Sequence, residues 1–356
     1  MYLAAAGRAF PENYYSQSDL LDTLRRLWVE EHFNQERLER LHRNVLVDGR
    51  YLALSVDEYE ALETWGDANN AWIRVAPEVG ARAITAALKD AGLEASDIDA
   101  LFAVTVTGVA TPSLDAKVMN RLDMRSDVKR VPIFGLGCVG GAAGIARAVD
   151  YVRAFPDQIA VLLSVELCSL TVQRGDLSVA NLIATGLFGD GGAAVVVAGA
   201  ESKAARRAAE RGRPRALDTR ATFYRDSEHI MGWDVSEKGF GIILSADVPK
   251  VAENRLRPEV DAFLADHDLT IDQIETWIAH PGGPRVLNAM EASLDLPEDA
   301  LELTWKSLRH AGNLSSSSVL MVLRDTLDQR TPAAGSYGLL LALGPGFCAE
   351  QVLLQY

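Results

Sequence analysis

One cysteine of this chain stands in a setting suited to nucleophilic chemistry. The motif GLGCVGG places Cys138 between an apolar run at 131–134 and a helical pattern at 143–155, so the cysteine is expected at the start of a helix. The partial positive charge of a helix N-terminus stabilises a thiolate, and the flanking glycines permit a tight turn and the close approach of a substrate. The alternative is an inert cysteine buried among small residues.

A histidine and an asparagine further along the chain complete a candidate triad. His280 ends an apolar run and precedes Pro-Gly-Gly, so it is expected at the carboxyl end of a strand, where sites form in α/β sheets. Asn313 precedes four serines and a helical pattern, so taken alone it is interpreted as part of a helix N-cap. His280 taken alone could equally be a structural histidine. Together they suit two chemistries. His280 could stabilise a Cys138 thiolate as an ion pair, or His280 and Asn313 could both donate to an oxyanion.

The elements that would position these residues alternate along the chain. Helical patterns fall at 17–43, 72–92, 143–155 and 283–294, and residues 1–10 read as a first strand. Short apolar runs predict buried strands at 98–106, 131–134, 159–165, 193–197, 276–279 and 338–343. This alternation predicts an α/β fold with a buried, largely parallel sheet.

A polar, basic stretch at 201–215 is interpreted as the connection between two halves. The first half, residues 1–200, would carry Cys138, and the second, residues 201–356, would carry His280 and Asn313. The spacings of the three cysteines fit neither a zinc pattern nor a disulfide framework.

The bulk composition excludes several classes of function. A net charge of −14 argues against a broad nucleic-acid surface, although a local basic cluster could still hold an anionic substrate. No apolar run reaches the ~18 residues of a membrane span, and the first ten residues lack a basic leader with a long apolar stretch. An odd number of cysteines without a secretion signal indicates reduced thiols and a cytoplasmic protein.

Six motifs together make the sequence resemble the type III polyketide synthases, the group that contains chalcone and stilbene synthases. The resemblance covers most of the chain. It implies an α/β thiolase fold, in which two similar halves stack as five αβαβα layers, and a homodimer. The motifs are TVTGVATPS, GLGCVGGAAG, GLFGDGGAA, WIAHPGGP, AGNLSSSSV and the final GPG.

The resemblance also implies a division of roles within the triad. Cys138 would take an acyl starter from acyl-CoA as a thioester, and His280 and Asn313 would bind the carbonyl of malonyl-CoA as CO₂ leaves. Two donors at the enolate oxygen lower the barrier, because they act where negative charge develops. No metal or redox cofactor is implied.

Several further residues are expected to bind substrate by the same resemblance. Phe188 matches a gatekeeper phenylalanine, and Ile242 stands where plant members have a second one. Trp233 replaces a small glycine and would narrow the cavity or redirect its space. Thr171 matches a threonine of chalcone synthase. Thr107 and Ser315 lie within matched motifs, and Thr111 matches the residue that such dimers insert across their interface.

A basic helical face adds a candidate site for the CoA phosphates. Arg37, Arg40 and Arg43 recur every three residues and would share one face of a helix near the region where family members bind CoA. The alternative is an ordinary solvated face, and the acidic neighbours Glu36 and Glu39 favour it.

The aliphatic Ile242 and the phrase MGWDV favour a fatty acyl-CoA starter of medium to long chain, extended by malonyl units to an alkylpyrone or alkylresorcinol. One alternative is a malonyl-primed tetrahydroxynaphthalene synthase, against which Thr171 counts, because a cysteine is expected there. A second is a β-ketoacyl synthase III-like enzyme that uses acyl carrier protein. Two further hypotheses come from other classes of function: a non-catalytic thiolase-fold partner in a complex, and a cysteine hydrolase.

Overall fold

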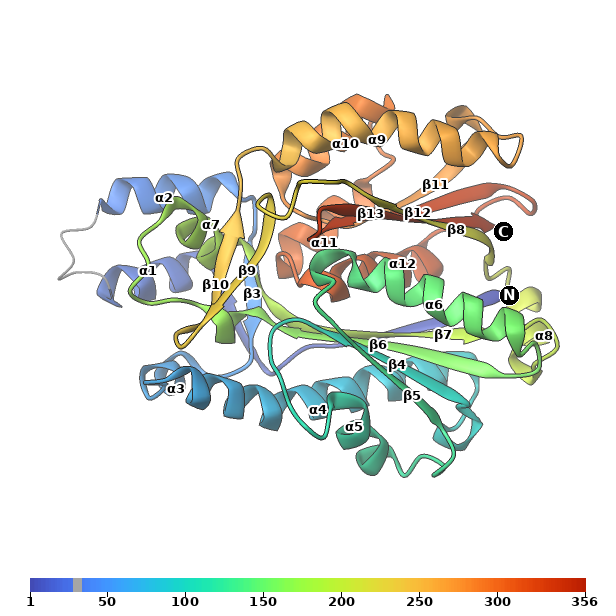
Figure 1. The fold of residues 1–356 in the computed structure, drawn as a ribbon, viewed down its shortest axis with the longest axis horizontal. Helices are drawn as coiled ribbons and strands as arrows, with labels where there is room; N and C mark the ends of the chain where they lie inside the picture. The colour runs from blue at the N-terminus through green and yellow to red at the C-terminus, as the bar shows by residue number, and fades with distance from the viewer. Residues whose placement is uncertain (28–33) are drawn as a thin grey trace.

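The computed structural model describes residues 1–27 and 34–356, and its elements stack in five layers (Figure 1). Helices form both outer layers, two sheets lie inside them, and further helices fill the middle (Figure 1). The expected αβαβα arrangement of the thiolase fold is therefore confirmed. The outer helices are α9 (Val248–Ala265) and α10 (Pro284–Leu294) on one face and α4 (Trp65–Ala91) and α5 (Leu114–Leu122) on the other. The middle helices are α6 (Gly140–Ala154), α11 (Glu302–Ala311) and α12 (Ser318–Gln329).

The two sheet layers are halves of one sheet with the strand order β11-β12-β13-β8-β1-β7-β6-β4-β5. A single residue pair, Tyr2 with Arg215, joins the halves where β1 meets β8. One half contains β1 (Tyr2–Ala9), β4 (Ala100–Thr105), β5 (Lys129–Phe134), β6 (Ile159–Leu167) and β7 (Asp190–Ala198). The other contains β8 (Arg215–Phe223), β11 (Ile274–Ala279), β12 (Tyr337–Gly344) and β13 (Cys348–Gln355).

The sheet is mixed, so the prediction of a largely parallel sheet is wrong. Only β4 with β5, β4 with β6 and β11 with β12 run parallel. The other neighbouring pairs are antiparallel. Apolar runs show that a strand is buried, but strand direction depends on the connections, which hydrophobicity does not encode.

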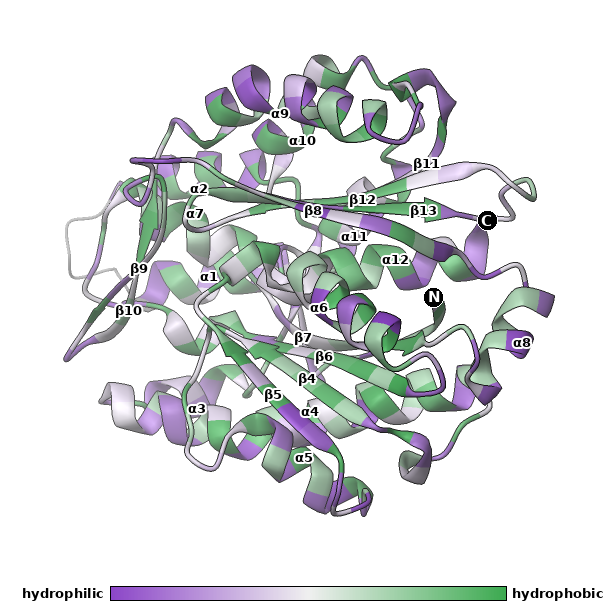
Figure 2. Ribbon diagram, turned by 45° about the vertical axis from the view of Figure 1, so that its right-hand side comes forward, coloured by the Kyte–Doolittle hydropathy of each residue, from purple (hydrophilic) through white to green (hydrophobic). Residues whose placement is uncertain are grey.

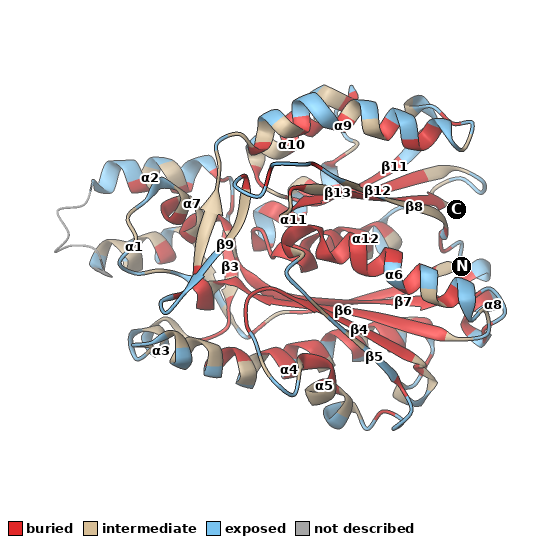
Figure 3. Cartoon of the chain, viewed as in Figure 1, coloured by how far each residue is buried: buried red, intermediate tan, exposed pale blue. Residues whose placement is uncertain are grey.

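Three apolar cores fill the spaces between the layers and hold the stack together. Trp72 and Ile84 of α4 pack beneath the first half-sheet, Ile145 of α6 packs between the half-sheets, and Phe263 of α9 packs above the second. Removal of this apolar surface from water is the main force that favours the layered fold. The middle helices and the central strands are accordingly the most buried elements (Figure 3). The strands β4, β6 and β7 are hydrophobic along most of their length (Figure 2).

Smaller elements gather at one end of the layers, opposite both chain termini (Figure 1). The predicted helix at 17–43 is two helices, and its Trp28 falls outside the described residues. The elements of this end are β2 (Asn13–Ser16), α1 (Gln17–Leu27), α2 (Gln35–Asn44), β3 (Gly49–Leu52), α3 (Val56–Glu60), α7 (Val179–Leu187), β9 (Met231–Ser236) and β10 (Gly239–Leu244).

The predicted connection at 201–215 contains a helix that the sequence pattern did not reveal. This helix, α8 (Lys203–Glu210), buries only alanines, Ala204, Ala205 and Ala208, so it has no stripe of large apolar residues. The stretch still leads from β7 to β8. No helix among the described residues is long and apolar enough to cross a membrane.

Candidate active site

Cys138 lies in a 3₁₀ turn, Gly137–Val139, directly before α6, so the prediction of a cysteine at a helix start is confirmed. Glycines make this turn possible. Gly137 has a φ of +54°, and a Cβ there would lie 2.6 Å from the ring of Pro345. A Cβ on Gly141 would lie 2.2 Å from the carbonyl oxygen of Ser316. The glycines therefore let the start of α6 approach the loop that carries Asn313.

The backbone around Asn313 fixes the orientation of its side chain. The Asn313 N–H donates to the Leu187 carbonyl at 2.8 Å, and its carbonyl accepts from the Gly189 N–H at 3.0 Å. Its Oδ1 accepts from the Ser315 N–H at 2.8 Å. This turn, in which Ser315 has a φ of +46°, occupies the acceptor end of the amide, so the donor end, Nδ2, points the other way.

His280 follows the last residue of β11, as predicted, and its backbone N–H donates to the Leu341 carbonyl at 2.9 Å. Its side chain is buried, and neither ring nitrogen has a hydrogen-bond partner among the described residues. The turn after it lies against Asn313, because the Asn313 Nδ2 donates to the Gly282 carbonyl at 3.4 Å. A buried imidazole without partners is rare in a folded protein and is suited to bind a ligand.

Burial raises the pKa of the Cys138 thiol to about 12, although hydrogen bonds with the side chains of Ser315 and Asn313 lower it. Burial also lowers the pKa of His280 to about 3. Burial therefore favours an uncharged Cys138 and an uncharged His280 in the unliganded site. The ion pair and the oxyanion site both stay predictions. A neutral His280 keeps one donor and one acceptor nitrogen, so it can both take a proton and donate a hydrogen bond.

A buried carboxylate, Glu166 at the end of β6, lies behind the cysteine. Its Oε2 accepts from the Thr107 hydroxyl at 2.8 Å and the Val106 N–H at 3.1 Å, and its Oε1 accepts from the Ser316 hydroxyl. Burial raises the pKa of Glu166 to about 7, although these hydrogen bonds oppose the shift. Glu166 therefore ties the end of β4 to the serine loop that follows Asn313.

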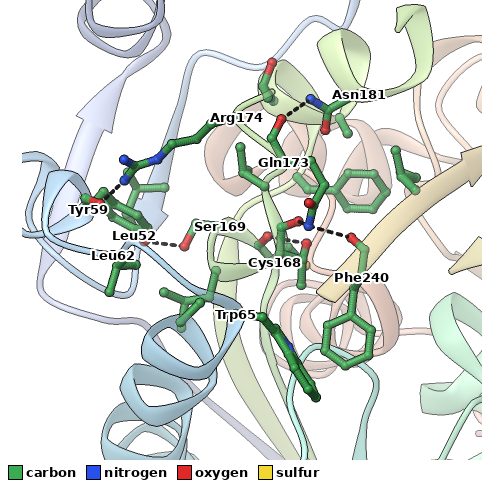
Figure 4. Close-up of a pocket in the computed structure, with 18 of the residues that line it drawn as sticks. Leu52, Tyr59, Leu62, Trp65, Cys168, Ser169, Gln173, Arg174, Asn181 and Phe240 are labelled. Atoms are coloured by element: carbon green, nitrogen blue, oxygen red, sulfur yellow. Dashed lines mark hydrogen bonds between the residues drawn. The ribbon is translucent and has the colours of Figure 1, made fainter. Parts of the chain in front are cut away.

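A cavity of about 480 Å³ opens at the same end of the layers. Figure 4 shows part of its wall, including Trp65, Cys168 and Phe240. The wall also includes four of the expected substrate-binding residues. These are Thr171, Phe188, Trp233 and Ile242. The side chains of the triad are not part of this wall. Phe188 and Cys168 connect the two regions. Phe188 forms a backbone bridge with Asn313, and burial, with a smaller contribution from Cys138, raises the pKa of Cys168.

Trp233 and Ile242 form a cross-strand pair on the β9–β10 hairpin, and both line the cavity. Directly opposed residues of an antiparallel pair lie on the same face of the ribbon, so one hairpin shapes this side of the wall. Much of the cavity wall is apolar. Its small and aliphatic apolar residues from α1, β3, α4 and the adjoining turns are Leu20, Leu24, Leu52, Leu62, Ala68 and Leu170.

The remaining expected residues lie outside the cavity wall. Thr107 is buried and directs its hydroxyl at Glu166, and Ser315 lies beside the sulfur of Cys138. Thr111 is on the surface, in the loop before α5. The three arginines of α2, Arg37, Arg40 and Arg43, are all exposed.

Sequence patterns missed the polar residues of the wall. Arg50, Tyr59 and Ser169 line the cavity, yet they come from β3, α3 and the turn after β6. The only available signal was the motif VELCSL, which contains Ser169. The described residues contain no group of three or more His, Cys, Asp or Glu side chains placed to hold a metal ion.

Comparison with known proteins agrees with this geometry. Residues 1–202 match the N-terminal domain of chalcone and stilbene synthases, and residues 217–356 match the C-terminal domain. The 1,3,6,8-tetrahydroxynaphthalene synthase of Streptomyces peucetius subsp. caesius is 50% identical over 99% of this chain and 93% of its own length. A putative chalcone synthase of Bacillus subtilis (strain 168) is 33% identical, over 100% of this chain and 98% of its own length.

Among solved structures, the 1,3,6,8-tetrahydroxynaphthalene synthase of Streptomyces coelicolor A3(2) superposes with a TM-score of 0.90. It is 32% identical, and the match covers 99% of this chain and 98% of that one. The chain therefore belongs to the chalcone and stilbene synthase family. It is a type III polyketide synthase, an acyltransferase that condenses CoA thioesters with malonyl-CoA.

Proposed function

We propose that this synthase is primed by malonyl-CoA and forms a naphthalene tetrol. The observation that carries the proposal is the 50% identity with a tetrahydroxynaphthalene synthase over nearly the whole chain. The objection from Thr171 loses its force, because Cys168, on the same 3₁₀ turn, lines the same cavity and supplies a cysteine there. The cavity lies within the ~300–1,000 Å³ typical of small-molecule sites, which accommodates a two-ring product.

Cys138, His280 and Asn313 would perform the condensation in three steps. The Cys138 sulfur attacks the starter thioester while its proton passes to His280 and then to the departing CoA thiolate. A second malonyl thioester places its carbonyl oxygen against the His280 N–H and the Asn313 Nδ2. As the C–CO₂ bond breaks, its electron pair becomes an enolate stabilised by these two donors. The enolate carbon then forms a bond to the acyl carbon, and the Cys138 thiolate leaves.

A fatty acyl starter remains the second candidate, and one observation favours it. The apolar side chains of Leu20, Leu24 and Leu62 in the cavity wall are suited to contact an alkyl chain. Each methylene buried there would contribute about 0.8 kcal/mol to binding. The products in that case would be alkylpyrones or alkylresorcinols.

Two assembly features belong to the same proposal. A homodimer is supported by β5, which lies at one edge of the sheet and exposes Phe134, because an uncovered strand edge with an apolar side chain is suited to pair with a second copy. The surface position of Thr111 is compatible with insertion into a partner.

The phosphates of CoA have three candidate partners on α2. These are Arg37, Arg40 and Arg43, which are all exposed.

Mass spectrometry of the products, with and without acyl starters, tests the proposal. With malonyl-CoA alone, the purified protein should form the naphthalene tetrol or its oxidised quinone, and Cys138→Ala should form neither. Cys138→Ala should still release CO₂ from malonyl-CoA, because His280 and Asn313 remain. If only starters of about six to sixteen carbons yield products, the malonyl-primed assignment is wrong. Release of CoA with no carbon–carbon bond formation would reject both assignments.

A further inference from the structure

A chain of hydroxyl groups connects the cavity to a buried carboxylate. Tyr59 and Ser169 both line the cavity, and their hydroxyl oxygens are within hydrogen-bond distance of each other (Figure 4). The Ser169 hydroxyl in turn donates to Asp190 at the start of β7. With the Tyr59 hydroxyl donating to Ser169, the chain runs from the cavity surface to Asp190 through two groups.

Asp190 itself has no exposed surface. Two backbone groups hold it in place: the Ser169 N–H donates to Oδ1 at 2.8 Å, and the Ala53 N–H donates to Oδ2 at 2.6 Å. Burial raises the pKa of this carboxyl to about 6, although these hydrogen bonds and the nearby Arg50 pull it down. A carboxylate in this position can reach a ligand only through intervening hydroxyl groups.

This hydroxyl chain lies next to the region where an elongating product would sit. Ser169 follows Cys168, which also lines the cavity. Burial raises the pKa of Cys168, and Glu166, Asp190 and Cys138 add to this shift. Trp65 and Phe240 line the same wall (Figure 4). The mechanism proposed above uses none of Tyr59, Ser169 and Asp190.

We propose that Tyr59, Ser169 and Asp190 form a proton relay that catalyses the aldol closure of a ring. In this step a C–H between two ketones gives its proton to the Tyr59 oxygen, the Tyr59 proton moves to Ser169, and the Ser169 proton moves to the Asp190 carboxylate. The carbanion forms a bond to a ketone carbon of the same chain. The ketone oxygen becomes an alkoxide and takes the proton back through the relay, so the protein ends unchanged. Loss of water then gives the aromatic ring.

The inference rests on the proposed function, because it assigns the ring closure of the same site. The test uses Tyr59→Phe and Ser169→Ala. Each variant removes one hydroxyl, and the backbone hydrogen bonds to Asp190 stay in place. The measurement is the ratio of aromatic product to pyrone, together with the release of CO₂ and CoA from malonyl-CoA. Positioned acid–base groups contribute about 10²–10⁴-fold to a step, so this ratio should fall by at least about tenfold in both variants. Release of CO₂ should fall much less than this ratio, because decarboxylation is assigned to His280 and Asn313.

Two control variants separate a relay from a structural role. Ser169→Thr keeps a hydroxyl and should keep most of the aromatic product. Tyr15→Phe removes a phenol that accepts a hydrogen bond from the Val56 N–H at 3.1 Å, outside the cavity wall, and should leave the product ratio unchanged. The relay is rejected if the ratio of aromatic product to pyrone in Tyr59→Phe and Ser169→Ala equals that of wild type. This holds whether both products fall in parallel or neither changes.

Failure of the proposed function would look different. A wild-type enzyme that makes no aromatic product from malonyl-CoA alone, but makes resorcinols and pyrones from acyl starters, would reject malonyl priming. The ratio of resorcinol to pyrone then tests the relay in the same variants, because resorcinol formation also needs an aldol closure.

Discussion

The proposed role of Asn313 depends on a backbone contact that orients its side chain. An amide side chain has a donor end and an acceptor end, and only the donor end can stabilise an enolate. The hydrogen bond from the Ser315 N–H occupies Oδ1, so Nδ2 is held in one orientation before any substrate arrives. A donor that is fixed in advance needs no reorganisation as charge develops.

Asn313→Asp should separate this donor from the structure of the loop. The carboxylate can still accept from the Ser315 N–H, but it cannot donate, and it places negative charge where the enolate forms. Decarboxylation of malonyl-CoA should fall about 10²–10³-fold, and the melting temperature should change little. A rate of CO₂ release within twofold of wild type would contradict the assigned role of Asn313.

The start of α6 is the element whose position depends most on its glycines. A Cβ on Gly141 would meet the Ser316 carbonyl oxygen at 2.2 Å and the Val319 side chain at 2.8 Å. Gly141→Ala should therefore push α6 away from the serine loop and cost about 1–3 kcal/mol of unfolding free energy, measured by urea denaturation. The matched control is Gly175→Ala, because a Cβ at Gly175 would meet nothing within 4 Å. Equal stability of the two variants would show that α6 can shift freely.

The buried contacts of Glu166 should make the stability of the fold depend on pH. Its folded pKa is about 7, raised from 4.5, so between these values the folded state binds more protons than the unfolded state, and stability falls as pH rises. Across the window this amounts to about 3 kcal/mol. Glu166→Gln cannot ionise, so its stability relative to wild type should improve by up to that amount from pH 4.5 to pH 7. An offset between the two proteins that is independent of pH would contradict the shifted pKa.

For the molecule as a whole, the sequence predicts apolar buried strands better than it predicts half-exposed strands or sites built from distant parts of the chain. Every predicted strand is present. A short, continuous apolar run such as 159–165 must be buried along its whole length, and an interior strand such as β6 buries every one of its residues. The strands β8, with the sequence RALDTRATF, and β9, with the sequence MGWDVS, were missed, because their half-exposed residues form no apolar run. The strand β13, with the sequence CAEQVLLQ, was missed although it is buried, because polar residues interrupt its apolar ones. The candidate triad was predicted from its motifs. The proposed relay was not, because Tyr59, Ser169 and Asp190 meet only after three distant elements have packed.

The proposed homodimer gives a prediction at the same scale. Phe134, at the end of the edge strand β5, is 52% exposed, and burial of such side chains would stabilise a dimer. Phe134→Lys should therefore shift the protein toward monomer in analytical ultracentrifugation. Val235→Lys is the matched control, since Val235 is 60% exposed but lies on β9. A wild-type protein that sediments as a monomer would reject the dimer.

The aromatic wall of the cavity has a consequence for spectroscopy. Of the six tryptophans in the chain, Trp65 and Trp233 both line the cavity, and the ring centroid of each lies 5.9 Å from that of Phe240. Indole emission shifts with the polarity of its surroundings, so the arrival of an acyl group and the departure of water should change the intrinsic fluorescence. The protein thus carries its own optical reporter, with which the filling and emptying of the cavity can be followed during turnover without a label.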